Sequence, residues 1–391
     1  MKKQKICIIG GGLTGLVTAI ILSRLNLKID LITGAVKQNI NTNRTTSISE
    51  DNYNYLCKSN ILKINLKDFW PCHSIKLYSD NSDKKIDEIF QLKEKKDTRI
   101  FYTINNNKLT NQIFTKIKNE KIINIKSSKN VTKIFSNGLL KNVQLSNKES
   151  SKYNLIIICA GNNSNLLKNF DQKKNHIKKS YNEVSITTII KHKRLNNKTA
   201  RQLFLNDGII ALLPISNDST SIVWSLSKNL FKEYNKSHNY FKKKIEIYAK
   251  DFLKNIKFVS KIEVKDLNLL IRKKYYEDRV LLFGDALHTI HPFVGQGFNM
   301  ILRDLSCFEK ILKQKINLGL DIGNGDVLSE FSKEAKPRNF IFQISVDLLK
   351  NCFTYQNNSL KNWRNIVLKN LDNNKFTKSQ FMKFANLGFR F

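Results

Sequence analysis

Residues 5–33 read KICIIGGGLTGLVTAIILSRLNLKIDLIT. Ile6, Ile8 and Ile9 form an apolar run typical of a strand that is buried on both faces. The glycine-rich turn that follows opens an apolar segment with helical spacing, and residues 28–33 form a second apolar run. This stretch therefore predicts strand, tight turn, helix and strand, the opening unit of a Rossmann-like α/β fold.

The glycines of this turn have separable physical roles. Gly10 makes the sharp turn, Gly12 lets the backbone approach a pyrophosphate, and Gly15 lets helix and strand pack closely. The unpaired N–H groups of the first helical turn, which includes Leu13 and Thr14, can then hold the phosphates. We therefore predict a dinucleotide site at this turn.

One expected feature of that site is missing. An acidic residue usually binds the adenosine ribose at the end of the second strand, about 20 residues after the glycines. Thr33 occupies this position. A threonine can make one hydrogen bond there but no charge-assisted one. The sequence thus predicts a nucleotide site that lacks one anchor.

A signal peptide or membrane span is the alternative interpretation of the N-terminus. Three lysines precede the uncharged residues 6–23, as in an export signal. The four glycines at 10–12 and 15 would weaken a membrane helix, whereas a strand-to-helix turn needs them. No other segment is long and apolar enough to span a bilayer, so we expect a soluble or peripheral protein.

The composition excludes some classes of protein. Hydrophobic residues make up 41% of the 391 residues, which excludes wholesale disorder. The net charge of +35 comes mostly from isolated lysines, which favours a solvated basic surface. If an anionic partner exists, a membrane face is favoured over nucleic acid, because no stacking-aromatic or helix-turn-helix pattern accompanies the lysines. Six scattered cysteines without a CxxC pair indicate a reducing compartment and no disulfide framework.

A second motif, residues 278–299, reads DRVLLFGDALHTIHPFVGQGFN. Its apolar run 280–283 predicts another buried strand, which Gly284 and Asp285 end, so that the Asp285 carboxylate can bind a polyol hydroxyl. Pro292 and the residues 295–297 form a turn that leads into a helix. The positive end of that helix would stabilise negative charge developing above it. The alternative for Asp285 is that it caps a helix.

His288 and His291, three residues apart, could be a metal pair. No third ligand is placed by the sequence, so we favour turn residues near a cofactor or a purely structural role for both.

The sequence GDALHTIHPFVGQGFN, taken with the N-terminal fingerprint, resembles the flavin aromatic-ring hydroxylases of the p-hydroxybenzoate hydroxylase fold. It is most similar to the ubiquinone-biosynthesis hydroxylase branch. The segments 43–49 (NRTTSIS), 207–215 (DGIIALLPI) and 330–339 extend the similarity over nearly the whole chain. The resemblance implies an FAD-dependent monooxygenase that hydroxylates the aromatic ring of a polyprenyl phenol through a flavin hydroperoxide, with O2 as co-substrate and NAD(P)H as electron donor.

The two motifs and the resemblance together give the predicted site. The predicted cofactor-binding residues are Gly10, Gly12, Leu13, Thr14, Gly15, Thr33, Arg44, Lys108, Gly161, Gly284, Asp285, Pro292, Gly295, Gly297, Phe298 and Asn299. The predicted catalytic residues, as flavin-ring contacts, are Pro292, Gly295, Gln296 and Gly297. No metal is predicted.

The chain departs from the family in a third motif, a strand that should end in Asp-Gly with an arginine following. The matching residues 155–167 read LIIICAGNNSNLL, so Ala160 replaces the acid and Leu167 the arginine. Each lost charged hydrogen bond would cost about 1.5–3 kcal/mol without compensation. Either FAD is held more loosely, or Arg44, Lys108 and Lys168 take over.

Three alternatives stay open, and these departures favour the first of them. One is an FAD-binding accessory protein of a quinone-synthesis assembly with weak or no hydroxylase activity. Another is a different flavin oxidoreductase of the same fold, such as a prenyl-chain reductase. A basic nucleic-acid-binding protein is the least favoured alternative, and we expect no nucleic-acid partner.

The expected architecture is α/β and interleaved. Residues 1–68, 99–170 and 279–313 should build a discontinuous FAD-binding domain. Residues 69–98 and 171–278 should build a mixed, mostly antiparallel sheet that encloses the substrate, and 314–391 a C-terminal helical region. The apolar and basic tail (Phe381, Phe384, Phe389, Lys375, Lys378, Lys383) should pack on the body, the alternative being an anionic membrane face. We expect a cytoplasmic protein, peripheral to the inner face of the membrane, in contact with that membrane or a quinone-synthesis complex.

Overall fold

The structure is a computed structural model of residues 1–391. It describes residues 3–34, 43–59, 68–80, 86–93, 99–161, 164–171, 176–234, 239–292, 295–354 and 364–367. Phe293 and Val294 and the aromatic and basic residues of the predicted tail (375–389) lie outside the described residues. The described residues form four sheets and a set of helices, which confirms the predicted mixed α/β class.

A six-stranded sheet carries the N-terminal glycine turn. Its order is β19 (Tyr276–Glu277), β20 (Val280–Leu282), β12 (Leu155–Ile158), β1 (Lys5–Ile9), β2 (Lys28–Ile32) and β8 (Ile123–Lys126). The five strands from β20 to β8 are parallel, and β19 pairs antiparallel with β20. The apolar runs of β1 and β12 are almost wholly buried, as expected for strands of a parallel sheet that is covered on both faces.

Helices from both ends of the chain cover this sheet. They are α1 (Leu13–Leu22), α3 (Asn106–Lys118), α7 (Gly297–Asn317) and α8 (Gly325–Thr354), with α2 (Glu50–Lys58) and the short α4 (Lys168–Asp171) nearby. The predicted boundary at residue 313 falls inside α7, because the helix continues until the left-handed Gly319 ends the run.

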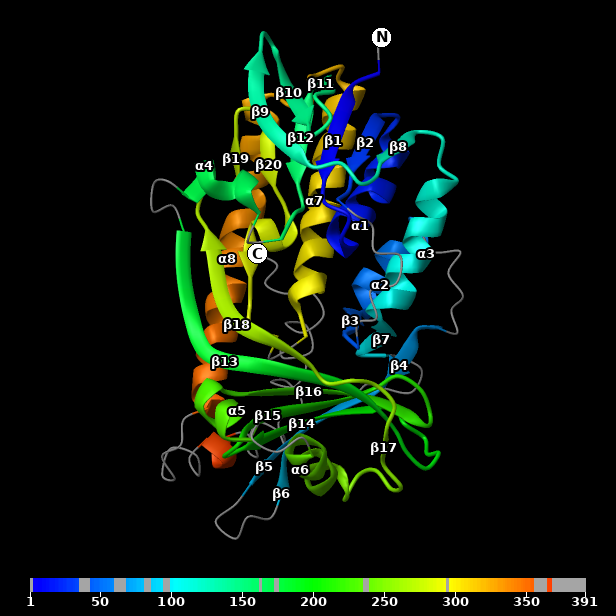
Figure 1. Cartoon of the computed structure of the whole chain (residues 1–391), viewed down its shortest axis with the longest axis vertical. Helices are drawn as coiled ribbons and strands as arrows, with labels where there is room; N and C mark the ends of the chain where they lie inside the picture. The colour runs from blue at the N-terminus through cyan, green and yellow to red at the C-terminus, as the bar shows by residue number, and fades with distance from the viewer. Residues whose placement is uncertain are drawn as a thin grey trace.

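A nine-stranded sheet lies below the first one in Figure 1. Its main order is β21 (His288–Thr289), β18 (Glu263–Arg272), β13 (His176–Lys191), β16 (Ser219–Ser227), β15 (Gly208–Pro214), β14 (Thr199–Leu205), β5 (Ser74–Asp80) and β6 (Ile86–Lys93), with β17 (Lys257–Phe258) paired to β13. Among the described strands of this sheet only β14 and β5 pair in parallel, so the sheet is mixed and mostly antiparallel. Its far face packs on α6 (Tyr240–Ala249) around the fully buried Trp224, beside α5 (Lys228–Tyr234).

Two small sheets complete the fold. The first is β3 (Thr45–Ser49), β7 (Phe101–Asn105) and β4 (Trp70–Cys72), and the second is β11 (Ser150–Tyr153), β10 (Leu140–Leu145) and β9 (Val131–Asn137). Trp70–Cys72 was expected in the substrate sheet, but it pairs with β7 instead. The domain boundaries themselves stay a prediction.

Candidate functional site

The carboxyl ends of three parallel strands meet at one edge of the six-stranded sheet. Ile9 is in register with Ile158, and Ile158 with Leu282, although these residues are far apart in the sequence. The N–H of Gly10 donates to the Ile32 carbonyl over 2.9 Å, which fixes the turn at the end of β1. In open parallel sheets, ligands bind outside the carboxyl ends of the strands, at the point where the connections after two neighbouring strands leave the sheet in opposite directions. The fold therefore brings the three predicted motifs together at this edge.

The backbone requires two of the glycines in the first motif. Gly10 has φ +132°, and a Cβ on it would lie 2.8 Å from the backbone carbon of Cys159. A Cβ on Gly15 would overlap the Gly10 carbonyl oxygen, so this glycine allows α1 to pack on the turn. Gly12 differs, because nothing lies within 4 Å of its Cβ position. The open space above Gly12 is where the predicted pyrophosphate contact would have to form.

The N-terminus of α1 fits a bound phosphate. Gly12 is the N-cap, it supplies no side-chain cap, and the first turn contains no acidic residue. The N–H groups of Leu13 and Thr14 consequently point into the open space without a capping side chain. Such a helix start attracts anions through its N–H groups and its dipole.

Asp285 is exposed at the same edge. Its short 3-10 helix, Gly284–Ala286, is capped by no side chain. Among the residues the structure describes, no hydrogen-bond or ion-pair partner is found for the Asp285 carboxylate. The structure shows no capping hydrogen bond from Asp285 in the described residues, so the carboxylate is available for a hydroxyl of an extended cofactor. Together with the cradle at Gly12, this edge fits FAD.

The second motif builds a turn and a helix start next to this edge. The N–H of Gly295 donates to the Pro292 carbonyl over 3.0 Å, and Gly295 has φ +62°, which favours glycine. Helix α7 then begins at Gly297 with Gln296 as N-cap, again without a side-chain cap. Pro292, Gly295, Gly297 and Phe298 are partly exposed, so they can contact a ligand. Their roles as flavin-ring contacts stay predictions.

Two predicted cofactor residues face inward instead. Asn299 is fully buried, donates to the Ser47 carbonyl over 3.1 Å and accepts from the Ser49 N–H over 2.9 Å. The structure therefore assigns Asn299 to the junction between α7 and β3. Thr33 is also fully buried, and its side chain lies directly below Gly11. Its hydroxyl has no hydrogen-bond partner in the described part of the chain.

Two of the predicted replacement cations already form ion pairs with acidic side chains. Arg44 lies 4.0 Å from Glu263 across the interface with the nine-stranded sheet. Lys108 forms an ion pair of 2.9 Å with Asp68 and is largely exposed. Leu167, in the position of the missing arginine, is only 1% exposed and belongs to the core. This burial means that a hydrophobic contact has replaced a charge there.

A pocket of about 230 Å³ lies between the second motif and the nine-stranded sheet. One wall carries Thr289, Ile290 and Pro292, and another carries Arg44, Thr45 and Asn106. The sheet contributes Ser185, Thr187, Val223 and the residues 263–268 of β18. The lining combines hydrogen-bonding side chains with apolar surface, so the pocket suits a ring that carries a polar group.

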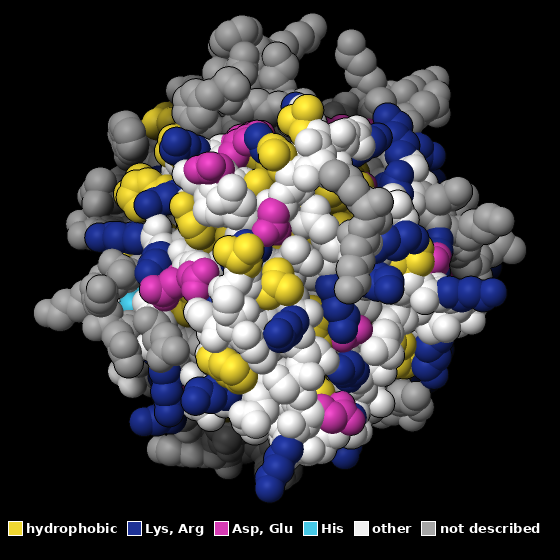
Figure 2. All heavy atoms as spheres, turned by 90° about the horizontal axis from the view of Figure 1, so that it is seen from above, with side chains coloured by type: hydrophobic (Ala, Val, Ile, Leu, Met, Phe, Trp, Pro, Cys, Tyr) yellow, Lys and Arg dark blue, Asp and Glu magenta, His cyan; other side chains and the backbone are white. Residues whose placement is uncertain are grey.

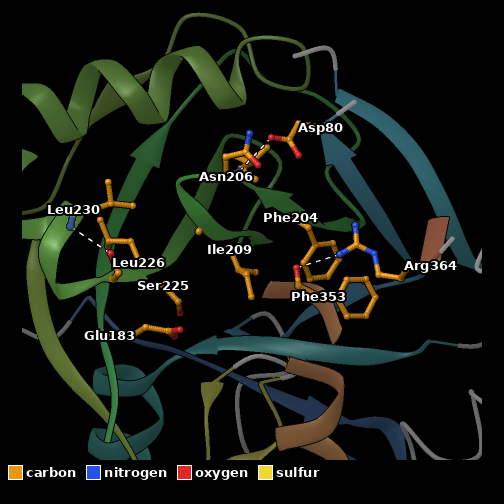
Figure 3. Close-up of a pocket in the computed structure, with 13 residues that line it drawn as sticks. Asp80, Glu183, Phe204, Asn206, Ile209, Ser225, Leu226, Leu230, Phe353 and Arg364 are labelled. Atoms are coloured by element: carbon orange, nitrogen blue, oxygen red, sulfur yellow. Dashed lines mark hydrogen bonds between the residues drawn. The ribbon is translucent and has the colours of Figure 1, made fainter. Parts of the chain in front are cut away.

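A second pocket of about 140 Å³ lies on the same face of the sheet, toward the end of α8. Figure 3 shows Arg364 beside the rings of Phe353 and Phe204 at one end, with Glu183 and Ser225 toward the other. Arg364 donates to the Phe353 carbonyl over 3.1 Å and to the Ser79 hydroxyl over 3.1 Å. These bonds attach residues 364–367 to the last turn of α8 and to β5.

Each of the two histidines of the second motif bonds a carboxylate. His288 Nε2 lies 3.1 Å from Asp304 Oδ2, and Asp304 also accepts from Arg338 over 2.9 Å and from Asn339 over 2.8 Å. Among the described residues, no group of three metal-ligating side chains is found. The sequence did not predict this network between His288, α7 and α8. The only available signal was the spacing of 16 residues between His288 and Asp304.

The surface charge shows no single basic patch on the face of Figure 2. Lysine and arginine side chains are spread over this face, with acidic and apolar side chains between them. In the described part of the chain, no helix combines the length and the apolar character needed to cross a bilayer.

Comparisons with known proteins agree with this architecture. A family model described as squalene epoxidase matches residues 152–387. The mitochondrial ubiquinone biosynthesis monooxygenase COQ6 of Dictyostelium discoideum is 28% identical over 331 residues, covering 71% of this chain and 66% of the relative. The 3-demethoxyubiquinol 3-hydroxylase of Escherichia coli is 30% identical over 186 residues, covering 47% of each chain. This chain thus spans less than two thirds of the length of these curated relatives.

Solved structures show the same fold at low sequence identity. The p-nitrophenol 4-monooxygenase PnpA of Pseudomonas putida has a TM-score of 0.80 at 14% identity, covering 100% of this chain and 99% of that one. An HpxO variant of Klebsiella pneumoniae complexed with FAD has a TM-score of 0.77 at 14% identity, covering 98% and 99%. The predicted resemblance to ubiquinone-biosynthesis hydroxylases and to their fold is confirmed.

Proposed function

Because the chain belongs to the squalene epoxidase family, we propose that it is an FAD-dependent monooxygenase that hydroxylates the aromatic ring of a polyprenyl phenol in ubiquinone biosynthesis. The names of the curated relatives support the substrate class. The observation that carries the proposal is the pocket between Pro292 and the nine-stranded sheet, because Pro292 belongs to the turn that leads to the uncapped start of α7.

Each part of the proposed cofactor site has its own residues. The Gly10–Gly12 turn and the start of α1 would hold the diphosphate, and Asp285 a hydroxyl of the extended chain. The backbone N–H groups of Gln296 and Gly297 would face the ring, where the positive end of α7 favours negative charge. When bound, the flavin supplies the redox chemistry that activates O2.

The protein's own task at the pocket is to orient the ring and to exclude water. Thr187, Asn268 and Lys265 offer hydrogen bonds to a phenol oxygen from the sheet side. Pro292 forms part of the opposite wall, so a ring would be held between the two. A phenol activates its own ring carbons, so no additional general base is required. We infer NAD(P)H as the electron donor, and contact with a membrane or a quinone-synthesis complex as the source of the apolar substrate.

The experiment has two readouts on purified full-length protein. Extracted FAD is identified by chromatography, and turnover with NADPH, a short-chain polyprenyl phenol and ¹⁸O2 is followed by mass spectrometry. The proposal predicts a product with one ¹⁸O on the ring. A product with ¹⁸O across a double bond of the prenyl chain would instead support epoxidation, which the family's name favours as the second candidate.

The accessory role remains the contrasting proposal, since Ala160 and the buried Leu167 replace two polar anchors of the third motif. Anaerobic mixing with NADPH separates the two. A flavin absorbance that does not bleach over many minutes would favour the accessory role, and rapid bleaching would favour the enzyme.

A further inference from the structure

Glu183 lies where strand β13 is irregular. The register between β13 and β18 shifts between Ser180 and Glu183, and Asn182 between them has φ +54°. A bulge of this kind bends a strand and re-aims the next side chain. Glu183 is thereby directed from the sheet toward the second motif and α8, and Figure 3 shows it beside the second pocket.

The Glu183 carboxylate bonds a histidine and a lysine from distant parts of the chain. Its Oε2 lies 3.0 Å from His291 Nε2, and its Oε1 lies 2.6 Å from Lys350 Nζ. The side chains are 15%, 0% and 8% exposed for Glu183, His291 and Lys350. Burial alone would raise the pKa of Glu183, but the hydrogen bonds from His291 and Lys350 outweigh it and lower the pKa, so the group is ionised.

The position of His291 connects this carboxylate to the candidate pocket. His291 directly precedes Pro292, which forms part of the pocket wall. Two residues along β13 from Glu183, on the same face of the sheet, Ser185 lines the opposite wall. One carboxylate therefore links both walls of the pocket. Through Lys350 it also links them to α8, and the Tyr181 ring packs edge-on against His291 at 5.0 Å.

We propose that Glu183 is a positioning residue that holds the Pro292 turn at a fixed distance from the substrate sheet. It acts through His291 and needs no contact with substrate or cofactor. The kinetic part of this inference rests on the proposed function, whereas the conformational part does not. A merely stabilising ion pair would change the melting temperature without a local effect on the residues before Pro292.

The test compares Glu183→Gln and Glu183→Asp with Glu330→Gln in the full-length protein. Glu330 forms an ion pair of 2.6 Å with Lys315 between α7 and α8, so it controls for the loss of a helix ion pair away from the pocket. Hydrogen–deuterium exchange of the amides at 286–291 is measured for each variant. We expect at least tenfold faster exchange in Glu183→Gln, an intermediate effect in Glu183→Asp, and wild-type exchange in Glu330→Gln.

Steady-state kinetics give the second readout. Glu183→Gln should lower kcat at least tenfold while KM for the phenol changes less than threefold, because orientation is lost and binding groups remain. If Glu183→Gln does not fold, the comparison of Glu183→Asp with Glu330→Gln decides. Unchanged exchange at 286–291 in the Glu183 variants, or an equal change in Glu330→Gln, would overturn the proposal. A wild-type protein without hydroxylase activity would contradict the proposed function alone, because the exchange measurement still decides the positioning role.

Discussion

The glycine turn after β1 makes a prediction that separates cofactor binding from folding. In Gly12→Ala the new methyl group meets no atom within 4 Å, and Gly12 already has φ −76°, which alanine adopts freely. The stability change should therefore stay within about 0.5 kcal/mol. The same methyl group would occupy the space in which a pyrophosphate approaches the backbone. Loss of about one charge-assisted hydrogen bond, roughly 1.5–3 kcal/mol, would weaken FAD binding roughly 10- to 150-fold.

Gly15→Ala is the opposite case. Its methyl group overlaps the Gly10 carbonyl oxygen, so α1 must move away from the turn. Such overpacking costs about 1–3 kcal/mol, and the melting temperature should fall together with FAD affinity. FAD is titrated into apoprotein by flavin fluorescence, and melting is followed by calorimetry. The reasoning is refuted if Gly12→Ala binds FAD like the wild type, or if it loses as much stability as Gly15→Ala.

Three other predictions follow from buried and exposed charges. Asp30 is 3% exposed, accepts a hydrogen bond from Tyr153 over 2.7 Å and pairs with Lys5 over 2.9 Å. Burial opposes its ionisation, but these partners outweigh burial and lower its pKa in the folded protein. Asp30 therefore stabilises the fold above its unfolded pKa near 4, and this contribution is lost as the pH falls through the lower folded pKa. Asp30→Asn should then cost about 3 kcal/mol at pH 7 and flatten the acid side of a stability–pH profile below pH 4; an unchanged profile would contradict this. Asp285→Asn should weaken FAD binding about tenfold with an unchanged melting temperature, because the carboxylate is exposed; a fall in melting temperature would instead indicate a structural role. Leu167→Arg should lower stability by at least about 3 kcal/mol in urea unfolding without improving FAD binding, since the residue is 1% exposed; tighter binding would show that the arginine site is still open.

Local patterns predicted the parts of the fold that depend on neighbours in the sequence. The apolar run at residues 6–9, the glycine turn and the helix after it are all visible in one short segment, and the structure has β1 and α1 there. The second motif likewise predicted a strand, a turn closed at Gly295 and the start of α7.

The remainder depends on partners that no local pattern reveals. Periodicity gives Asn299 a place on α7, but only the packed structure shows that its amide is used by Ser47 and Ser49. The same holds for Glu183, whose partners lie 108 and 167 residues away in the chain. The parallel pairing of β14 with β5 also joins segments about 125 residues apart, beyond the reach of hydrophobic periodicity.

The order of strands in the six-stranded sheet has a consequence for biosynthesis. Strand β1 pairs on one side with β12, which in turn waits for β20 at residues 280–282. In a nascent chain that has emerged from the ribosome only to residue 150, the β1 edge that later pairs with β12 is therefore an exposed apolar strand edge. Such late closure is slow and prone to aggregation, so the emerging chain should depend on chaperones until about three quarters of it has been translated. Ribosome-stalled chains ending before and after β20 should differ sharply in protease resistance.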